Sequence, residues 1–227
     1  MKLRLILTLL IFSMAIKMAN SQEKVNLLNG KVLEGTIQST EDEKITMMVN
    51  EKKGKVYDTY LENYRVFSII TSDGKENIIY KQDSSIGNFL EPKDMNFYIK
   101  GEQDAYKNYR PIGTMIIGTT LGLGLGIFDT YVFNDDPTTP NVNEKGMFKV
   151  DSPGYLMFVY PFIYTVLAGI APRPQLDIHN ITDRNNLNSE HFIQGFARVA
   201  RYKRTIRALI FSAVGSAIGL GSYYIFK

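Results

Sequence analysis

The sequence predicts an α+β fold in which a small antiparallel β domain, either a barrel or a curled sheet, precedes a helical membrane unit. Two observations lead to this class. Short runs that alternate apolar and polar residues, separated by turn signals, fill residues 22–83. Two apolar stretches with regularly spaced glycines, at 113–128 and 208–226, dominate the remainder. In water each glycine weakens a helix by about 1 kcal/mol relative to alanine, whereas in lipid small residues allow helices to pack closely.

Residues 1–21 have the pattern of an export signal. Lys2 and Arg4 precede a continuous apolar run, and Ala19 and Ser21 are the small residues expected before a cleavage site. The alternative is a first transmembrane helix. The chain has no cysteine, which excludes a lipoprotein anchor, disulfides and thiolate metal sites. Export without disulfides suits a protein of the bacterial cell envelope.

The net charge of the chain indicates which kinds of partner it would attract. The formal net charge is +3, and removal of the three basic residues of the signal would bring it to zero. A neutral chain has no overall field that attracts polyanions. We therefore expect no nucleic-acid partner.

The small β domain is predicted over 22–83, as five or six strands at a spacing of roughly ten residues. The pairs Asn29-Gly30 and Asp73-Gly74 are signals for tight turns between strands. SH3-like and Sm-like barrels are similar in size and strand order. That likeness concerns architecture and implies no activity.

Residues 84–111 are expected to form a linker and a juxtamembrane helix. We expect Gly101 near the start of this helix, because Glu102 and Asp104 would then lie in the first turn, where acidic side chains are stabilising.

Residues 112–227 form the predicted helical membrane region, in which the segments 112–133, 155–171 and 208–226 compete for spanning roles. The first and third are long enough to cross a bilayer. The middle segment is short and contains Pro161, so spanning, re-entrant and interfacial arrangements all remain open.

The two glycine-spaced stretches each place small residues on one helical face, which predicts helix packing through that face and a homo-oligomer formed through it. These residues are Gly118, Gly122 and Gly126 in the first stretch, and Ser212, Gly215, Ser216 and Gly219 in the second.

A basic amphipathic helix is predicted over 189–207, with Ser189 as its N-cap and an apolar stripe of Phe192, Phe196 and Val199. We expect this helix to lie on the anionic surface of a lipid bilayer before the chain enters it. The basic residues of this surface recur every three positions and are Arg198, Arg201, Arg204 and Arg207. The alternative is a solvated helix that packs Phe192 and Phe196 on the β domain.

The order of these segments resembles an uncharacterised envelope protein family of Bacteroidetes-type bacteria. The likeness rests on the signal peptide, the LLNGKVLEGTI and YIKGEQDAYKNY runs, the glycine-rich span and the C-terminal GFARVARYKRTIRALIFSAVGSAIGLG. It implies a location in the cell envelope and carries no activity.

Membrane topology is the point at which the signals disagree. Export places the β domain in the periplasm, and with three spans the basic stretch 172–207 would then be periplasmic too, against the positive-inside rule. A two-span hairpin with a re-entrant middle segment satisfies the rule. We favour the hairpin, in which the glycine-rich helices of 112–133 and 208–226 pack antiparallel. The membrane itself, inner or outer, stays open.

No catalytic constellation is recognisable in the sequence, so we expect a non-enzymatic protein without a cofactor or a metal, with a structural or interaction role and a partner in the envelope. The two histidines, His179 and His191, lie in different predicted contexts. Asp129, one turn from the end of the first span, is the candidate functional acid. The alternative function is a small channel or transport accessory protein in which Asp129 and the glycine stripes line a path.

Overall fold

A computed structural model describes residues 22–41, 43–50, 54–134, 156–172 and 181–226. It divides into two compact units. The first, called here the sheet unit, comprises residues up to Gln103 together with Asn188–Gly195. The second, the helical unit, comprises Asp104–Leu187 and the chain from Phe196 onward.

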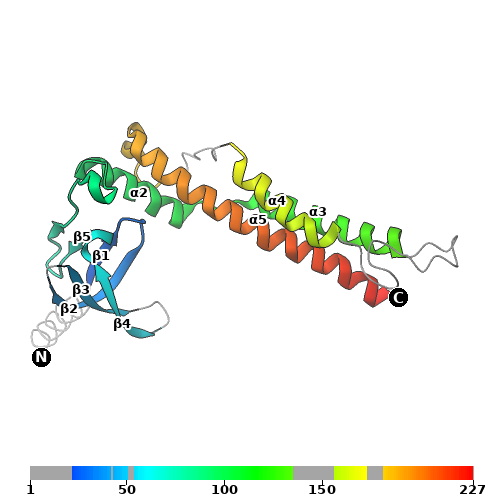
Figure 1. The fold of residues 1–227 in the computed structure, drawn as a ribbon, viewed down its shortest axis with the longest axis horizontal. Coiled ribbons are helices and arrows are strands. Elements are labelled where there is room, and N and C mark those ends of the chain that lie inside the picture. The colour runs from blue at the N-terminus through cyan, green and yellow to red at the C-terminus, as the bar shows by residue number, and fades with distance from the viewer. Residues whose placement is uncertain (1–21, 42, 51–53, 135–155, 173–180, 227) are drawn as a thin grey trace, which may run out of the picture. The chain divides into compact units, whose positions relative to one another are not determined.

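The sheet unit contains a six-stranded antiparallel sheet in the order β4-β3-β2-β1-β5-β6. The strands are β1 Glu23–Leu27, β2 Val32–Thr40, β3 Lys44–Asn50, β4 Val56–Glu62, β5 Val66–Ile70 and β6 Glu76–Ile78 (Figure 1). Gly30 lies in the β1–β2 turn and Gly74 in the β5–β6 turn, both at positive φ. The two turn signals therefore mark hairpins, as expected.

The sheet is open. Its edges are β4 and β6, and no pairing joins them among the described strands, so the predicted closure into a barrel is not supported. One face carries the core, built on Val25, Ile45, Met47 and Val66, which are at most 1% exposed. The α+β class is thus present, with an open antiparallel sheet as its β part.

Helix α2, Pro92–Asn108, covers a second cluster of the sheet unit. Ile99 packs there with Phe67 and Tyr80, and the Tyr80 hydroxyl donates a hydrogen bond to the Leu90 carbonyl at 2.8 Å. The expectation that this helix starts near Gly101 is wrong. Proline at the first helical position has its φ preset for a helix and needs no amide donor, which explains the start at Pro92.

The remaining helices are α3 Ile112–Asn134, α4 Leu156–Ile170 and α5 Glu190–Phe226. The segments expected separately at 189–207 and 208–226 form one continuous helix, α5, of about 55 Å at 1.5 Å per residue. The apolar stripe of its first part is buried within the protein: Phe196 and Val199 pack against Ala105 and Tyr109. That stripe is therefore not available to lie on a membrane surface.

In the helical unit α3 and α5 run parallel, and α4 runs antiparallel to α3 (Figure 1). Gly118 faces Ser212 and Gly126 faces Gly219, so the contacts move toward the C-terminal ends of both helices together. The antiparallel hairpin expected from the sequence is wrong in this respect. A small-residue face predicts close approach but carries no information on direction, which explains the error.

Candidate functional site

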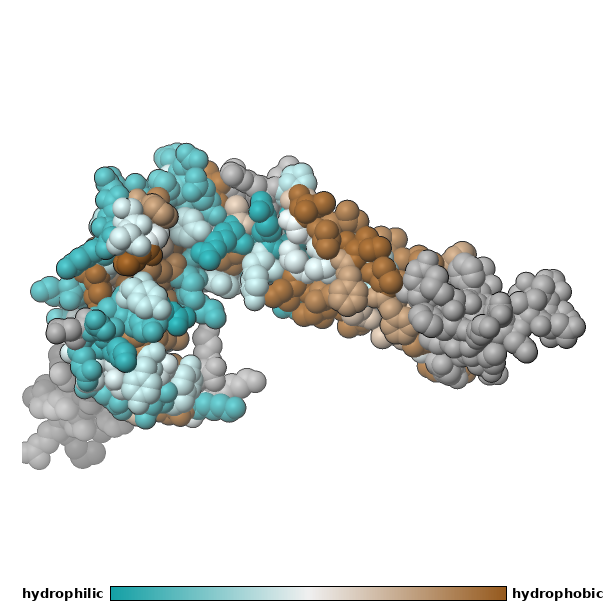
Figure 2. All heavy atoms as spheres, in the orientation of Figure 1, coloured by the Kyte–Doolittle hydropathy of each residue, from teal (hydrophilic) through white to brown (hydrophobic). Residues whose placement is uncertain are grey.

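The helical unit has an apolar exterior. Large side chains such as Ile117, Phe162 and Ile218 are more than half exposed to solvent, whereas Ser212 and Ser216 are buried. Figure 2 shows this apolar surface over α3, α4 and α5. A water-soluble bundle has the opposite arrangement, with large apolar residues inside. This surface is suited to a lipid environment.

Small residues bring α3 and α5 into backbone contact. A Cβ added at Gly122 would lie 2.5 Å from the Ser212 carbonyl oxygen, and one added at Gly126 would lie 2.9 Å from the Ser216 carbonyl oxygen. From the other side, a Cβ at Gly215 would lie 2.3 Å from the Thr119 carbonyl oxygen. All seven predicted packing residues thus lie at one interface within the chain.

This packing bears on the predicted homo-oligomer, which remains a prediction. The glycine face of α3 is occupied by α5 of the same chain. Self-association that preserves the fold must therefore use another surface.

Several hydroxyl groups in the helical unit bond to backbone carbonyls. Ser212 Oγ donates to the Ala208 carbonyl at 2.6 Å, and Thr119 Oγ1 to the Met115 carbonyl at 3.0 Å. Between helices, the Tyr164 hydroxyl donates to the Thr114 carbonyl at 2.9 Å. Such bonds satisfy polar groups where water is absent.

Three uncharged segments end at one level of the helical unit. No Asp, Glu, Lys, Arg or His occurs in 111–128, 156–172 or 208–226. Lys203, which precedes the third segment, donates a hydrogen bond to the carbonyl of Tyr109, which precedes the first segment. Arg204 donates to the carbonyls at the end of the second segment. A change from charged to uncharged sequence at one common level is the pattern of a membrane boundary.

Lys203 and Arg204 cap two helix C-termini at this level. Lys203 Nζ donates to the carbonyl oxygens of Ala105 and Tyr106 in the last turn of α2, at 3.1 and 3.0 Å, and to that of Tyr109 just beyond it, at 2.8 Å. Arg204 donates to the Ala171 and Pro172 carbonyls at 2.7 and 2.9 Å, at the end of α4. Cations stabilise helix C-termini because the carbonyl dipoles point toward them.

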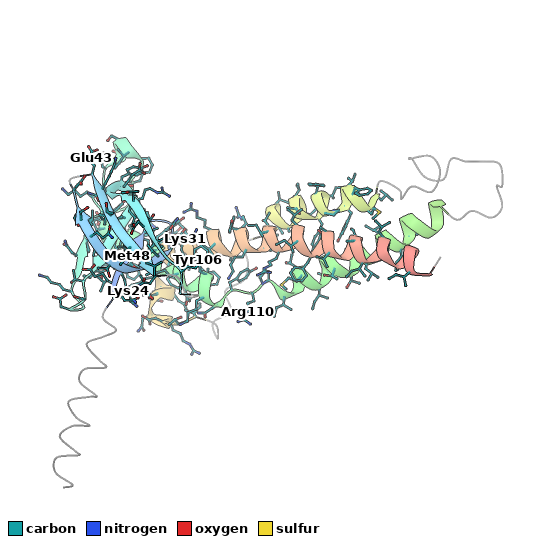
Figure 3. The ribbon with its side chains drawn as sticks, turned by 90° about the horizontal axis from the view of Figure 1, so that it is seen from below. Lys24, Lys31, Glu43, Met48, Tyr106 and Arg110 are labelled. Atoms are coloured by element: carbon teal, nitrogen blue, oxygen red, sulfur yellow. The ribbon has the colours of Figure 1, made fainter. Side chains whose placement is uncertain are left out.

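The charges around Lys203 are alike. Burial, together with the positive charges of Arg207 and Arg110, lowers the pKa of the Lys203 ammonium, which lies before the uncharged segment that begins at Ala208. Arg110, labelled in Figure 3, lies between α2 and α3. The contacts of Lys203 join residues that are distant in the chain, so the sequence pattern did not indicate them.

The other predicted basic residues lie on α5. Arg198, Arg201 and Arg207 are exposed, whereas Arg204 is half-buried against α4. The predicted surface of four arginines is therefore divided, with Arg204 committed to a structural contact.

A buried carboxylate fixes a connecting segment of the helical unit to α2. Asp104, 7% exposed, accepts hydrogen bonds from the Thr182 hydroxyl at 2.5 Å and from Asn108 Nδ2 at 2.8 Å. Its position late in α2, rather than in a first turn, explains its role: it holds the chain that leads to α5.

The remaining candidates provide no catalytic arrangement among the described residues. Asp129 lies in α3, but its side chain is outside the described part, as is all of His179. His191 Nε2 lies 3.7 Å from Asp94 Oδ2. No group of three metal-ligating side chains occurs in the described ranges.

The sheet unit has a shallow hollow of about 540 Å³. Its lining mixes polar residues such as Glu23, Asn63 and Asn77 with Ile37 and Ile69. The Glu23 carboxylate accepts a hydrogen bond from the Ile37 amide at 2.6 Å. That carboxylate is thus engaged in holding β2.

By length and composition, α5 can cross a membrane over Glu190–Ser222. Only 28% of its most apolar window is buried, whereas a core helix of a soluble protein would be mostly buried. α2 and α3 supply a second candidate if they are counted as one broken span, and α4 is a shorter apolar helix. The length and apolar composition of α5 thus support membrane association.

Comparison of the chain with protein-family models, with curated proteins and with solved structures found no match.

Proposed function

We propose that this protein is a non-enzymatic membrane protein of the bacterial cell envelope, in which α3, α4 and α5 form the anchor and the sheet unit is displayed for a structural or interaction role. The observation that carries the proposal is the common end of the three uncharged segments, next to Lys203 and Arg204, on helices whose exterior is apolar. A cytosolic protein would gain nothing from this arrangement.

The directions of the helices favour three crossings over two. Because α3 and α5 are parallel, their N-terminal ends lie on the same side of a bilayer, and the intervening chain has to return across it. α4 is antiparallel to α3, since Tyr160 contacts Gly118 and Tyr164 contacts Thr114, and it supplies that return. The uncharged part of α5, 208–226, would span about 28 Å, close to the thickness of a hydrocarbon core.

The sheet unit is assigned to the periplasm on the strength of the predicted export signal. The basic residues before Ala208 oppose this assignment by the positive-inside rule. Two of them, Lys203 and Arg204, are engaged with helix carbonyls and have a structural reason to be there. The family resemblance is consistent with an envelope location and belongs to the same proposal.

The first experiment combines alkaline extraction with cysteine labelling. The full chain is expressed with Lys75→Cys, in the exposed β5–β6 turn, or with Lys145→Cys, in the sequence between α3 and α4. Because the native chain has no cysteine, each label is unique. We expect the protein to stay in the membrane pellet at alkaline pH. In intact spheroplasts an impermeant maleimide should modify the Lys75→Cys protein only.

The controls separate the parts of the proposal. Permeabilised cells should label both variants, which shows that both thiols are reactive. Release of the protein by alkali would contradict membrane insertion. Labelling of both variants in intact cells would contradict three crossings, and labelling of Lys145→Cys alone would place the sheet unit in the cytoplasm.

A further inference from the structure

The level at which the three uncharged segments end carries two arginines whose charge the fold does not neutralise. Arg110 and Arg207 are both exposed, and both lie near the half-buried Lys203. Arg110 follows Tyr109, whose carbonyl accepts from Lys203 Nζ at 2.8 Å, and Arg207 lies one turn after Lys203 on α5. Within the part of the chain that the structure describes, neither guanidinium forms an ion pair with an acidic side chain.

Lys203 cannot relieve this concentration of charge. Its three donors are directed to the carbonyls of Ala105, Tyr106 and Tyr109, which are dipoles and carry no net charge. The cluster thus keeps its positive charge beside an apolar surface, where repulsion between like charges is screened least. An anion bound there would compensate this charge.

The position of the cluster defines the class of anion. Arg110 directly precedes the uncharged segment that starts at Pro111, and Arg207 directly precedes the one that starts at Ala208. Exposed aliphatic residues close to the two arginines in sequence, such as Ile112 and Ile206, add an apolar surface to the cluster. Guanidinium groups form bidentate hydrogen bonds with phosphate oxygens.

We propose that Arg110 and Arg207 bind the phosphate of an anionic phospholipid, whose acyl chains lie along the apolar exterior of the helical unit. The site rests on the membrane insertion proposed above. It differs from the predicted surface of four arginines, because Arg204 is occupied at the end of α4 and Arg110 comes from another part of the chain.

The test uses the absence of tryptophan from the native chain. Ile210→Trp places a single fluorophore on α5 within the uncharged segment, one turn after Arg207, at a position that is 44% exposed. The full-length protein is reconstituted into vesicles that contain either phosphatidylglycerol or phosphatidylcholine with brominated acyl chains, which quench tryptophan on contact. A basic residue near an anionic surface contributes roughly fivefold in affinity, so we expect phosphatidylglycerol to be favoured about 30-fold.

Two double variants are compared in the Ile210→Trp background. Arg110→Gln with Arg207→Gln should remove the preference for phosphatidylglycerol. Lys93→Gln with Lys100→Gln removes the same charge from exposed positions of α2 and should preserve it. Equal quenching by both lipids in the parent protein, or an equal loss in the two double variants, would overturn the site.

Two further comparisons show whether the bound phosphate belongs to a lipid or to a soluble molecule, and whether a negative result contradicts the lipid site or membrane insertion. If glycerol 3-phosphate abolished the preference where sodium chloride of equal ionic strength did not, the site would bind soluble phosphate and the lipid assignment would be wrong. Absence of quenching by either lipid would refute insertion, and with it the proposed function. Quenching without a preference refutes the lipid site alone.

Discussion

At the scale of single residues, the helical unit depends on side chains that neutralise helix ends. Lys203 and Arg204 are adjacent in sequence, yet they cap different helices, α2 and α4. Their partners lie 94–98 and 32–33 residues away along the chain. No local pattern could have revealed these contacts, because helical spacing relates a residue only to its near neighbours. The arginine periodicity was visible in the sequence, but its division into capping and exposed members was not.

Replacement of Lys203 should therefore destabilise the protein well beyond the loss of a surface charge. Lys203→Met keeps the length of the side chain and removes the three hydrogen bonds that the ammonium donates at the end of α2. Hydrogen bonds to charged groups contribute roughly 1.5–3 kcal/mol each, so we expect a loss of about 2 kcal/mol or more. In a chain of this size that corresponds to a fall of roughly 4–8 °C in the melting temperature.

The measurement is thermal unfolding of the full-length protein in detergent, followed by circular dichroism. Lys100→Met is the matched control, because Lys100 is exposed in the middle of α2. Its melting temperature should change by less than about 2 °C, since surface substitutions usually alter stability by no more than 0.5 kcal/mol. Similar melting temperatures for the two variants would show that the capping contacts do not stabilise the fold.

At the scale of elements, the spacing of small residues identified the face through which α3 and α5 approach. It left the direction of packing open, because a stripe of glycines is equally suited to a parallel or an antiparallel neighbour. The start of α2 was misjudged for a related reason. Glu102 and Asp104 suggested a first turn, but both are buried late in the helix, and the actual start is marked by Pro92.

Because α3 and α5 are in close contact, we expect alanine to destabilise the protein at Gly122 and to stabilise it at Gly124. Gly122→Ala places a Cβ 2.5 Å from the Ser212 carbonyl oxygen and 2.9 Å from the Ser216 amide nitrogen, so the helices must separate. Overpacking of this kind typically costs about 1–3 kcal/mol. Gly124 has nothing within 4 Å of its Cβ position, and Gly124→Ala should stabilise the helix by up to about 1 kcal/mol.

Both variants are measured by thermal unfolding in the same detergent. The expected order of melting temperatures is Gly124→Ala, wild type, Gly122→Ala. A Gly122→Ala protein at least as stable as wild type would mean that the two backbones are not in contact at this position.

At the scale of the whole molecule, the sequence predicted those features that depend on residues close together in the chain. Strands, hairpin turns and apolar helices follow from alternation, Asn-Gly and Asp-Gly pairs, and composition, and these the structure contains. The open sheet and the continuity of α5 depend on pairing and packing between distant residues. Between 200 and 212, for example, the sequence changes from basic to apolar, and that change was interpreted as a break where the helix continues.

The parallel course of α3 and α5 is the feature on which the three-crossing topology depends, and paired cysteines test it directly. Thr119 Oγ1 donates to the Phe211 carbonyl at 3.4 Å, so Thr119→Cys with Phe211→Cys should be joined within one chain by a short bifunctional maleimide. In the parallel arrangement Ser222 lies about nine residues beyond the level of Thr119, roughly 14 Å along α5. Thr119→Cys with Ser222→Cys should therefore remain largely unlinked by the same reagent.

An antiparallel hairpin would reverse the two results, because it would bring Ser222 within about one turn of Thr119 and carry Phe211 away. The products are read as intramolecular linkage by mass spectrometry after proteolysis of membranes that contain the full-length protein. The chain has no native cysteine to compete for the reagent. Efficient linkage of the Ser222 pair alone would restore the two-span hairpin. It would also remove the requirement that α4 cross the bilayer, since α5 would then return the chain to the side from which α3 started.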